Sequence, residues 1–584
     1  MIKILRYMKP KEWLLVLASL VFIVAQVWLD LKLPDYMSEI TGYVQTEGST
    51  MSQIWKAGGY MLLCALGSLA AAIVVGFFAT RIAASFTARL RSMLFNKVET
   101  FSMEEINRFS TASLITRSTN DITQIQMLIT MGLQILIKAP ILATWAIVKI
   151  SGKSWQWTAT TAGAVVALLL FITIIGLIAL PKFKVIQSLT DNLNRVSREN
   201  LTGLRVVRAY NAEQYQEEKF EEANSALTQT HLFINRTMAS LMPFMMVIMN
   251  GLGLAVYWIG AHLIDRANMM DKIGLFSDMV VFSSYAIQVV MAFVMMTIIF
   301  IMMPRALVAA GRVNEVLDTP LSITDGTVKE TEEKGTVEFR NVSFKYPDSA
   351  DYVLENISFT AAQGETVAFI GATGSGKSTL INLIPRFYDA TEGEVLVNGI
   401  NVKEYEQKAL HNKLGYVPQR NVLFSGSVHS NVAYGCNNAL HRDSAVKKAV
   451  AIAQGKDFVE KMDNQYDAHV AQGGSNFSGG QKQRLSIARA IYRNPEIYIF
   501  DDSFSALDYK TDRVLRAALK DETSKATNLI VAQRIGTIMD ADKIIVLDEG
   551  KMVGCGTHRE LLKNCQVYQE IAFSQLSKEE LEYA

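Results

Sequence analysis

Cysteine is scarce in this 584-residue chain, and neither sign of charge is in excess. The four cysteines are too few for a disulfide framework and lack the spacing of metal ligands (Cys64, Cys436, Cys555 and Cys565). We therefore expect reduced, inert thiols in a cytosolic setting. The 57 basic and 56 acidic residues leave a net charge of +1, which gives no indication of a nucleic-acid partner, and we expect none.

Charge is also rare where the chain is most apolar. Half of all residues are apolar and only 19% are charged, and the apolar residues are concentrated in the first 304 positions. The chain is longer than a typical domain of about 100 to 200 residues, so at least two units are expected. This pattern predicts a membrane half followed by a soluble half.

Six apolar runs are long enough to cross a bilayer, since one helical crossing takes about 20 apolar residues. They lie near residues 13–33, 58–80, 128–150, 157–180, 238–263 and 279–303. The first run follows Lys3 and Arg6, as the apolar part of a signal peptide would, but it continues past Leu29 without a small-residue cleavage site. We therefore interpret it as a membrane span.

Basic residues predict the orientation of these spans. The segments joining the second run to the third and the fourth to the fifth are long and basic, with Arg81, Arg89, Lys182 and Arg195 among them. Because basic loops stay on the cytoplasmic side, both termini are predicted to be cytoplasmic. Apolar residues at helical spacing within these segments predict helices that extend beyond the bilayer.

Few ionisable residues interrupt the spans, and an unpaired charge in hydrocarbon is costly. Lys138 either lines a substrate cavity or faces the helix bundle, and both alternatives stay open. For Asp278 we favour a cap of the sixth span at the interface. Clustered methionines would form an adaptable drug-binding wall, although such stripes more often pack helices together (Met242, Met245, Met246, Met249, Met291, Met295 and Met296).

The hydropathy falls after Pro304, and a charged connector at 329–334 leads to a strand pattern at 336–344. Short β-rich runs then alternate with helical stretches, which predicts a parallel α/β sheet with covering helices. We expect a transmembrane domain of six long helices over 1–320, a linker over 321–335 and an α/β domain over 336–584.

The run Gly-Ala-Thr-Gly-Ser-Gly-Lys-Ser-Thr at 371–379 follows a predicted strand and opens a predicted helix. This order of strand, glycine-rich loop and helix is that of a phosphate-binding loop. Lys377 would reach the outer phosphates, and the Ser378 hydroxyl would bind Mg²⁺. We predict that ATP is bound by the whole run, namely Gly371, Ala372, Thr373, Gly374, Ser375, Gly376, Lys377, Ser378 and Thr379.

Further motifs follow in a fixed order. Ser478, Gly479, Gly480 and Gln481 precede a basic helix, and a buried-strand run at 497–500 ends in Asp501, which can hold Mg²⁺ through water. With Gln419 ahead of them and Ser505 to Asp508 behind, the second half resembles an ATP-binding cassette. Because six spans precede it, the whole chain resembles the half-transporter exporters of the ATP-binding cassette (ABC) superfamily.

This resemblance implies a role for each matched residue. Tyr346 would stack on adenine, Gln419 would sense Mg²⁺ and the attacking water, and Asp508 would lie at a dimer interface. The element Ser478 to Gln481 would contact the γ-phosphate of a nucleotide held by the other half of the dimer. The segments 107–116 and 200–210 resemble coupling helices, which dock on nucleotide-binding domains.

Two catalytic positions depart from the family pattern. The family places a glutamate after the strand-end aspartate to polarise the attacking water, but here Asp501 is followed by Asp502. The family places a histidine at the end of a later strand, and here that residue is Gln533, which cannot carry a proton or a positive charge. One reading is a slow but working homodimer. The reading we favour is a heterodimer in which only the site on this chain's own phosphate loop is weakened.

The sequence therefore predicts an ATP-hydrolysing exporter subunit that moves hydrophobic or amphipathic compounds, drugs or lipids, outward by alternating access. We expect ATP and Mg²⁺ as cofactors, a second half-transporter as partner, and a multi-pass location in the plasma or inner membrane. The alternatives are a homodimeric exporter with slow hydrolysis and an ATP-binding regulatory subunit that gates its partner.

Overall fold

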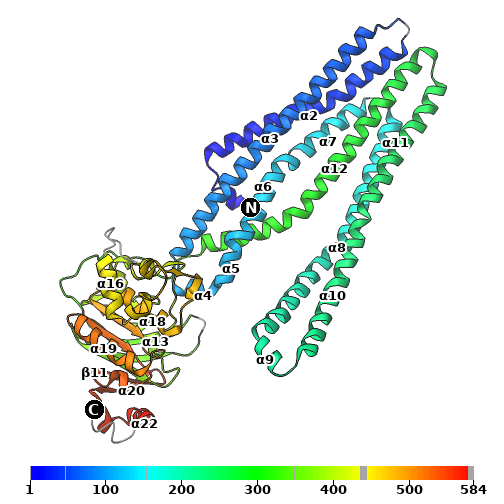
Figure 1. Ribbon diagram of the computed structural model, residues 1–584. Helices are drawn as coiled ribbons and strands as arrows, with labels where there is room; N and C mark the ends of the chain where they lie inside the picture. The colour runs from blue at the N-terminus through cyan, green and yellow to red at the C-terminus, as the bar shows by residue number, and fades with distance from the viewer. Residues whose placement is uncertain (1, 47, 153, 348, 435–442, 577–584) are drawn as a thin grey trace. The chain divides into compact units, whose positions relative to one another are not determined.

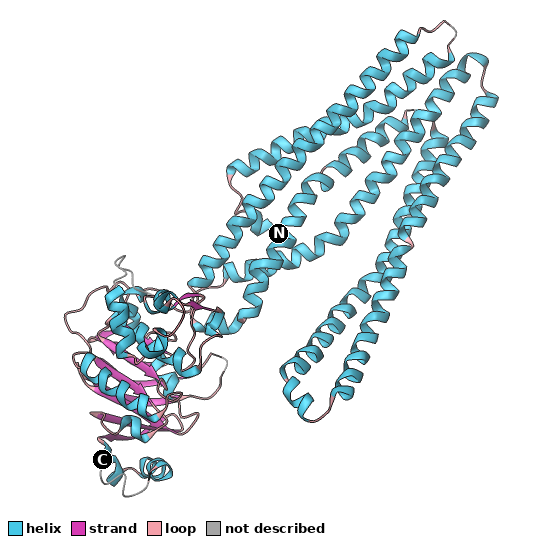
Figure 2. Ribbon diagram, viewed as in Figure 1, coloured by secondary structure: helices cyan, strands magenta, loops and turns pink. Residues whose placement is uncertain are grey.

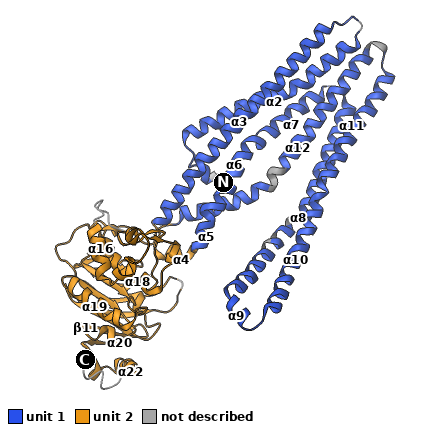
Figure 3. Cartoon of the chain, in the orientation of Figure 1, with its two compact units in different colours: residues 1–99, 111–319 blue, residues 100–110, 320–584 orange. Residues whose placement is uncertain are grey.

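The computed structural model describes all residues except 1, 47, 153, 348, 435–442 and 577–584, so Cys436 lies outside the described residues. The chain divides into two compact units, one of residues 1–99 and 111–319, and the other of residues 100–110 and 320–584 (Figure 3). Helices make up the first unit, and the strands lie in the second (Figure 2). Each unit is described by itself below.

The first unit is a bundle of long helices (Figure 1). Its elements are α1 Ile2–Leu5, α2 Pro10–Gln45, α3 Met51–Glu99, α5 Thr111–Thr116, η1 Arg117–Asp121, α6 Ile122–Met131, η2 Gly132–Leu136, α7 Lys138–Ser151, α8 Trp155–Thr202, α9 Leu204–Ala209, α10 Glu213–Ala239, α11 Leu241–Arg266 and α12 Met269–Asp318. The short η1 and η2 are π-helical, and they lie in the third long segment.

Six helical segments among the described residues are long and apolar enough to cross a membrane, which confirms the predicted number. They are Pro10–Gln45, Met51–Glu99, Thr111–Ser151, Trp155–Thr202, Glu213–Arg266 and Asp271–Asp318. The shortest has 36 residues. At a rise of about 1.5 Å per residue it spans about 54 Å, well beyond the roughly 30 Å of a hydrocarbon core.

The core of this bundle joins distant parts of the chain. Val27 of α2, Trp157 of α8, Val256 of α11 and Phe282 of α12 are buried in one apolar cluster. The indole N–H of Trp157 donates a hydrogen bond to the carbonyl of Val256 at 3.1 Å, so this buried polar group is satisfied. Close van der Waals packing and interhelical hydrogen bonds of this kind are expected to hold helices together where lipid replaces water.

The ionisable residues of the spans have definite places. The Lys138 ammonium lies 3.1 Å from the Asp30 carboxylate of α2, and Asp30 also accepts a hydrogen bond from Ser68 of α3. Lys138 therefore faces the bundle in an ion pair. Asp278 lies inside α12, whose N-cap is Asn268, so the expected capping role of Asp278 is wrong. The helix begins earlier, at Met269, because the segment 269–277 is itself largely apolar and contains no proline that would interrupt a helix.

The second unit contains two principal sheets. The larger has the order β12-β11-β3-β10-β9-β6, and the smaller, antiparallel sheet has the order β2-β1-β4-β5. The strands are β1 Val337–Phe344, β2 Leu354–Ala361, β3 Thr366–Gly371, β4 Glu392–Val397, β5 Ile400–Asn401, β6 Leu414–Val417, β7 Gly426–Ser427, β8 His469–Val470, β9 Ile497–Asp501, β10 Thr527–Val531, β11 Lys543–Asp548 and β12 Lys551–Gly556. All pairings in the larger sheet are parallel except that of β12 with β11.

Helices accompany these sheets in the second unit. They are α4 Met103–Phe109, α13 Lys377–Asn382, η3 Val402–Glu404, α14 Gln407–Lys413, α15 Val428–Val432, α16 Asp443–Ile452, α17 Lys456–Val459, η4 Gln465–Asp467, η5 Gln472–Gly474, α18 Gly479–Arg493, α19 Tyr509–Glu522, α20 Ile535–Ile538, α21 His558–Asn564 and α22 Gln566–Gln575. The predicted fold class, long helical spans joined to an α/β domain, is confirmed.

The parallel strands indicate where a ligand would bind in this unit. Every residue of β9 is buried, as expected for a strand covered on both faces. Strands β3, β9 and β10 are neighbours in the sheet and end at Gly371, Asp501 and Val531. Because ligands of α/β sheets bind at the carboxyl ends of the strands, these three ends mark the candidate site.

Candidate nucleotide site

The loop at 371–379 connects β3 to α13 through backbone conformations that require glycine. Gly376 has a φ of 94°, and a Cβ atom there would lie 2.7 Å from the Leu354 side chain. At Gly371 a Cβ atom would lie 2.0 Å from the Leu547 carbonyl oxygen. The glycines therefore allow the tight loop, and α13 begins directly after it at Lys377. A helix N-terminus reached through such a loop is suited to binding phosphate.

Lys377 lies across the inside of this loop. Its ammonium donates to the carbonyls of Gly371 and Ala372 at 2.9 and 2.8 Å. Burial lowers the pKa of Lys377, although the carboxylates of Asp502 and Asp501 oppose that shift. The Lys377 ammonium is thus bonded to neutral carbonyl oxygens and lies near the carboxylates of Asp501 and Asp502. The charged oxygens of a phosphate would accept stronger hydrogen bonds from it.

A hollow of 230 Å³ brings the ends of β9 and β10 together with the loop that follows β3. It is lined by Val353, Thr373, Gly374, Gly376, Lys377, Ser378, Thr379, Gln419, Asp501, Asp502, Val531 and Gln533. Most of the sequence-predicted nucleotide and catalytic residues therefore share one pocket. Val353 is an addition that the sequence analysis missed. No sequence pattern indicates Val353, because its position at the hollow depends on how the start of β2 packs against the phosphate loop.

The residues predicted to hold Mg²⁺ supply the oxygen ligands that this ion prefers. The Ser378 hydroxyl donates to Asp501 Oδ1 at 2.9 Å, and Gln419 lines the same hollow. Burial raises the pKa of Asp501, against the effect of the Ser378 hydrogen bond. Within the described residues there is no cluster of three or more histidine, cysteine, aspartate or glutamate side chains that would bind a metal by itself. The donors thus fit an ion that is shared with phosphate.

Asp502 and Gln533 contact each other at the edge of this hollow. Gln533 Nε2 donates to Asp502 Oδ2 at 3.0 Å, and Gln483 Nε2 donates to the Asp502 carbonyl at 3.3 Å. Asp502 has a φ of 47°, a left-handed conformation that few residues other than glycine adopt. Burial raises the pKa of Asp502 despite hydrogen bonds with Gln419 and Ser505. The amide of Gln533 thus occupies one oxygen of the carboxylate in the glutamate position.

Tyr346 lies on the other side of the loop. Its hydroxyl is 3.0 Å from Thr379 Oγ1, and its ring packs against Phe344 and Tyr388. A ring beside the phosphate loop is placed to stack on the base of a nucleotide. Tyr388 was not identified from sequence. An aromatic residue in a run such as 386–389 gives no pattern that separates a site from a core.

The residues from Ser478 to Gln481 form the N-terminus of α18. The Ser478 hydroxyl accepts from the Gln481 N–H at 3.3 Å, and the Gln481 side chain accepts from the Ser478 N–H at 2.9 Å. This reciprocal capping fixes the start of the helix. Asp508 is the N-cap of α19 and accepts from the Thr511 N–H at 2.9 Å, a hydrogen bond that lowers the pKa of Asp508. Neither element lines the phosphate-loop hollow.

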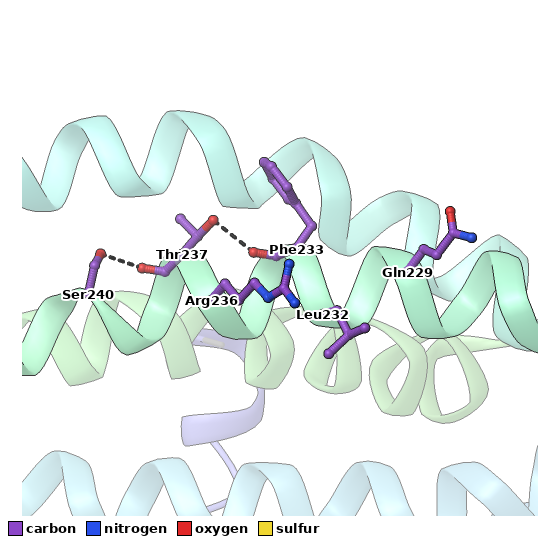
Figure 4. A pocket seen from close by; sticks show the side chains of 6 residues that line it. All are labelled: Gln229, Leu232, Phe233, Arg236, Thr237 and Ser240. Atoms are coloured by element: carbon purple, nitrogen blue, oxygen red, sulfur yellow. Dashed lines mark hydrogen bonds between the residues drawn. The ribbon is translucent and has the colours of Figure 1, made fainter.

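A larger hollow of 630 Å³ lies in the first unit (Figure 4). Its lining comes from one helix and its C-cap, namely Gln229, Leu232, Phe233, Arg236, Thr237 and Ser240. The dashed hydrogen bonds in Figure 4 run from Thr237 and Ser240 to backbone carbonyls of the same turn region. Because one helix supplies all of its lining, this hollow is an open surface and not an enclosed site.

A phosphate-loop domain joined to six membrane-crossing helices defines an ATP-driven membrane transporter. The chain belongs to the ABC transporter family: residues 354–505 match the family model described as ABC transporter, and residues 16–293 match the ABC transporter transmembrane region. ABC ATPase domains bind ATP, normally with Mg²⁺, and ABC exporters function as dimers in the lipid membrane. The chain is accordingly a multi-pass membrane protein.

Full-length relatives agree with this assignment. The chain is 38% identical to an uncharacterized ABC transporter ATP-binding protein of Mycobacterium tuberculosis, with 98% of this chain and 97% of that protein covered. It is 30% identical to an ATP-dependent lipid A-core flippase of Pseudomonas aeruginosa, covering 83% of this chain and 79% of the flippase. A bacterial Atm1-family ABC exporter with ATP bound matches with a TM-score of 0.80 at 25% identity, covering 95% and 98%. The chain is an ATP-driven ABC exporter of this architecture.

Proposed function

We propose that this chain is the half of a heterodimeric ABC exporter whose own ATP site hydrolyses weakly or not at all. The observation that carries the proposal is the pair Asp502 and Gln533, joined by a 3.0 Å hydrogen bond beside Lys377 and Ser378. All parts that bind phosphate are present, and the two parts that would activate water differ from the family pattern. The site therefore favours binding over turnover.

The chemistry of the pair supports weak hydrolysis at this site. Aspartate is one methylene shorter than glutamate, and an error of about 1 Å in placing a base costs about a hundredfold in rate. The Gln533 amide donates a hydrogen bond to Asp502 Oδ2, so that oxygen is less available to accept a proton from an attacking water. A neutral amide also cannot supply the positive charge that would stabilise the transition state.

The competent site of the pair would be built on the partner's phosphate loop. In the family arrangement each nucleotide lies between one chain's loop and the other chain's Ser-Gly-Gly-Gln element. Here that element, Ser478 to Gln481, is intact and rigidly capped. This chain would thus complete catalysis for a partner that carries glutamate and histidine at the positions matching Asp502 and Gln533.

The segments 107–116 and 200–210 are proposed as the coupling helices of this transporter. Residues 100–110, including α4, belong by their contacts to the second unit, although α3 before them and α5 after them belong to the first. Segment 200–210 contains α9 and exposes Tyr210, whose side chain is 79% accessible. The proposal also includes a transmembrane domain over 1–320, a linker over 321–335 and an ATP-binding cassette domain over 336–584. It places both termini in the cytoplasm and the protein in the plasma or inner membrane.

The substrate class we infer is hydrophobic or amphipathic, such as a drug or a lipid, carried outward by alternating access. The named flippase relatives of Pseudomonas support a lipid-like substrate. Met242 and Met246 of α11 are 69% and 66% exposed, whereas Met245 and Met249 pack against the helix core. Some of these methionines therefore pack within the helix bundle, and others are exposed on the surface of α11.

The test is ATP hydrolysis by the purified chain alone and by the chain co-purified with a candidate partner half-transporter, sought among the neighbouring genes. We expect weak hydrolysis alone and strong hydrolysis in the pair. Robust hydrolysis by this chain as a homodimer would instead establish the homodimeric exporter. A Lys377→Ala change in this chain that stops the pair, instead of slowing it, would favour the ATP-binding regulatory subunit that gates its partner.

A further inference from the structure

Three aromatic rings join the base side of the nucleotide site to a segment that phosphate binding does not use. Tyr346 and Tyr388 meet edge to face, with ring centroids 5.3 Å apart and planes at 88°. Phe344 packs against both rings, at 5.0 Å from Tyr346 and 5.6 Å from Tyr388. Because edge-to-face packing depends on orientation, a turn of the Tyr346 ring changes the packing of Tyr388.

Tyr388 is hydrogen-bonded to α4. Asn107 Nδ2 donates to the Tyr388 hydroxyl at 3.0 Å. The same helix is held to the second unit by Glu105, whose carboxylate accepts from the Ser322 N–H at 2.7 Å. A hollow of 270 Å³ borders Tyr346, Tyr388 and residues of this segment, so the rings have room to move. All of these contacts lie within the second unit.

The hydroxyl of Tyr346 and the face of its ring have different partners. Here its hydroxyl lies 3.0 Å from Thr379 Oγ1 in the phosphate loop. Stacking on a purine requires that the face of the ring be presented to the base. Binding of the base would therefore constrain the orientation of Tyr346, and the packing of the two rings would pass that constraint to Tyr388.

We propose that Tyr388 is a positioning residue that couples the base of the bound nucleotide to α4, so that the base, and not the phosphates alone, orders segment 100–110. The inference rests on the proposed base-stacking role of Tyr346. Since the segment continues directly into α3 and α5, ordering it constrains the ends of two helices of the membrane domain. The coupling is reciprocal: loss of the Asn107 bond also weakens the contribution of the base to binding.

The experiment is hydrogen exchange on the full-length chain in lipid nanodiscs, following the backbone amides of residues 101–110. Two probes are compared at saturation: a non-hydrolysable ATP analogue, and ribose 5′-triphosphate, which keeps the sugar and phosphates but lacks the base. Occupancy of both is verified by competition with labelled ATP. We expect the ATP analogue to slow exchange about two- to tenfold, the effect of one hydrogen bond, and the base-free probe to leave it unchanged.

Tyr388→Phe removes only the hydroxyl, so the ring cluster is kept while the bond to Asn107 is lost. We expect this variant to bind the ATP analogue but to lose the slowing of exchange. Tyr352→Phe is the matched control, because its hydroxyl bonds Glu392 at 2.9 Å and not a residue of α4. It should retain the full effect.

Three results would overturn the coupling. The base-free probe would protect the segment as well as the ATP analogue, or Tyr388→Phe would keep the full protection, or the bound analogue would leave exchange of the segment unchanged. Failure of the chain to bind the ATP analogue at all is a separate result in the same samples, and it would overturn the proposed ATP site together with the coupling.

Discussion

A single carboxylate determines how this ATP site is interpreted. Asp502 stands where its family has glutamate, and the structure adds that Gln533 holds one of its oxygens at 3.0 Å. The two departures thus form one interacting pair, and their effects on hydrolysis are expected to be non-additive. Neither change disturbs Lys377 or Ser378, which keep their contacts with the loop and with Asp501.

The first prediction concerns a double variant that restores the family residues, glutamate and histidine, at these two positions. Asp502→Glu together with Gln533→His should raise ATP hydrolysis by this chain about ten- to hundredfold, because the longer acid reaches the water and the imidazole can carry charge. The measurement is phosphate release by the purified chain. Asp502→Glu alone should gain less, since Gln533 still binds the carboxylate. Addition of Lys377→Ala should abolish the gain, and a gain that survives it would place the activity elsewhere.

A second prediction concerns the intramembrane ion pair between Lys138 and Asp30. The two side chains are 19% and 25% exposed and 3.1 Å apart, so removal of either one leaves a poorly solvated charge. Lys138→Met should lower the stability of the detergent-solubilised protein by about 2 to 3 kcal/mol. Lys138→Met combined with Asp30→Asn should recover most of that loss, as measured by thermal unfolding.

The control for this pair is Arg195, which bonds Glu199 one turn away with 57% of its side chain exposed. Arg195→Met should cost no more than about 0.5 kcal/mol, as for exposed pairs on helices. A double variant at Lys138 and Asp30 that is no more stable than the single variant would show that the pair is not coupled. A Lys138 role in substrate binding would then regain support.

Among the elements, the short helix α4 belongs by its contacts to the second unit, whereas α3 before it and α5 after it belong to the first. Ser102 and Glu105 cap each other at its start, and Glu105 also accepts from the Ser322 N–H at 2.7 Å. Burial alone would raise the pKa of Glu105, but the hydrogen bonds from Ser102 and Ser322 outweigh it and lower the pKa below the ordinary 4.5. The carboxylate is therefore a charged anchor for the segment.

The third prediction tests this anchor. Glu105→Gln should reduce the protection of residues 101–110 from hydrogen exchange, because one oxygen becomes an N–H₂ group that cannot accept; the loss should correspond to about 1 to 3 kcal/mol. Since the folded pKa is depressed, the stabilisation is complete above the ordinary 4.5 and is lost as the pH falls through the lower folded value.

Protection of the segment, corrected for intrinsic exchange, should therefore decrease in acid for the unchanged chain and stay low for Glu105→Gln. Glu104→Gln is the matched control, since the Ser322 N–H donates to Glu105 and not to the adjacent Glu104. A Glu105→Gln variant with unaltered protection would contradict the anchoring role.

For the whole molecule, the consequence of the proposed asymmetry is that the two ATP sites of the dimer are unequal. In that proposal Lys377 belongs to the weakened site, and Ser478 to Gln481 would complete the competent site on the partner. The fourth prediction follows: Lys377→Ala in this chain should slow ATP hydrolysis by the pair less than about tenfold. The equivalent lysine change in the partner should reduce it more than about hundredfold, as for loss of a transition-state donor.

Both measurements use the co-purified pair with equal expression of the two chains. Equal losses from the two lysine changes would contradict the asymmetric pump and favour two equivalent sites. Ser478→Ala in this chain provides a further comparison, because it should impair the pair as strongly as the partner's lysine change does.

The sequence by itself determined the two-part organisation, the six spans and the phosphate loop. Each depends on local patterns: an apolar run has a length, and a loop such as 371–379 has a fixed order of residue types. It also located the departures at Asp502 and Gln533. These positions could be found without a structure because the motifs that flank them are contiguous in the chain.

Only the tertiary structure decided which of these residues contact one another. The pairing of Lys138 with Asp30, the bond between Gln533 and Asp502, and the place of α4 beside Tyr388 each join residues far apart in sequence. Side-chain spacing along one element cannot specify such contacts, because they depend on how several elements pack. The interior position of Asp278 in α12 was missed for a related reason, since helix ends depend on capping contacts that apolar patterns do not report.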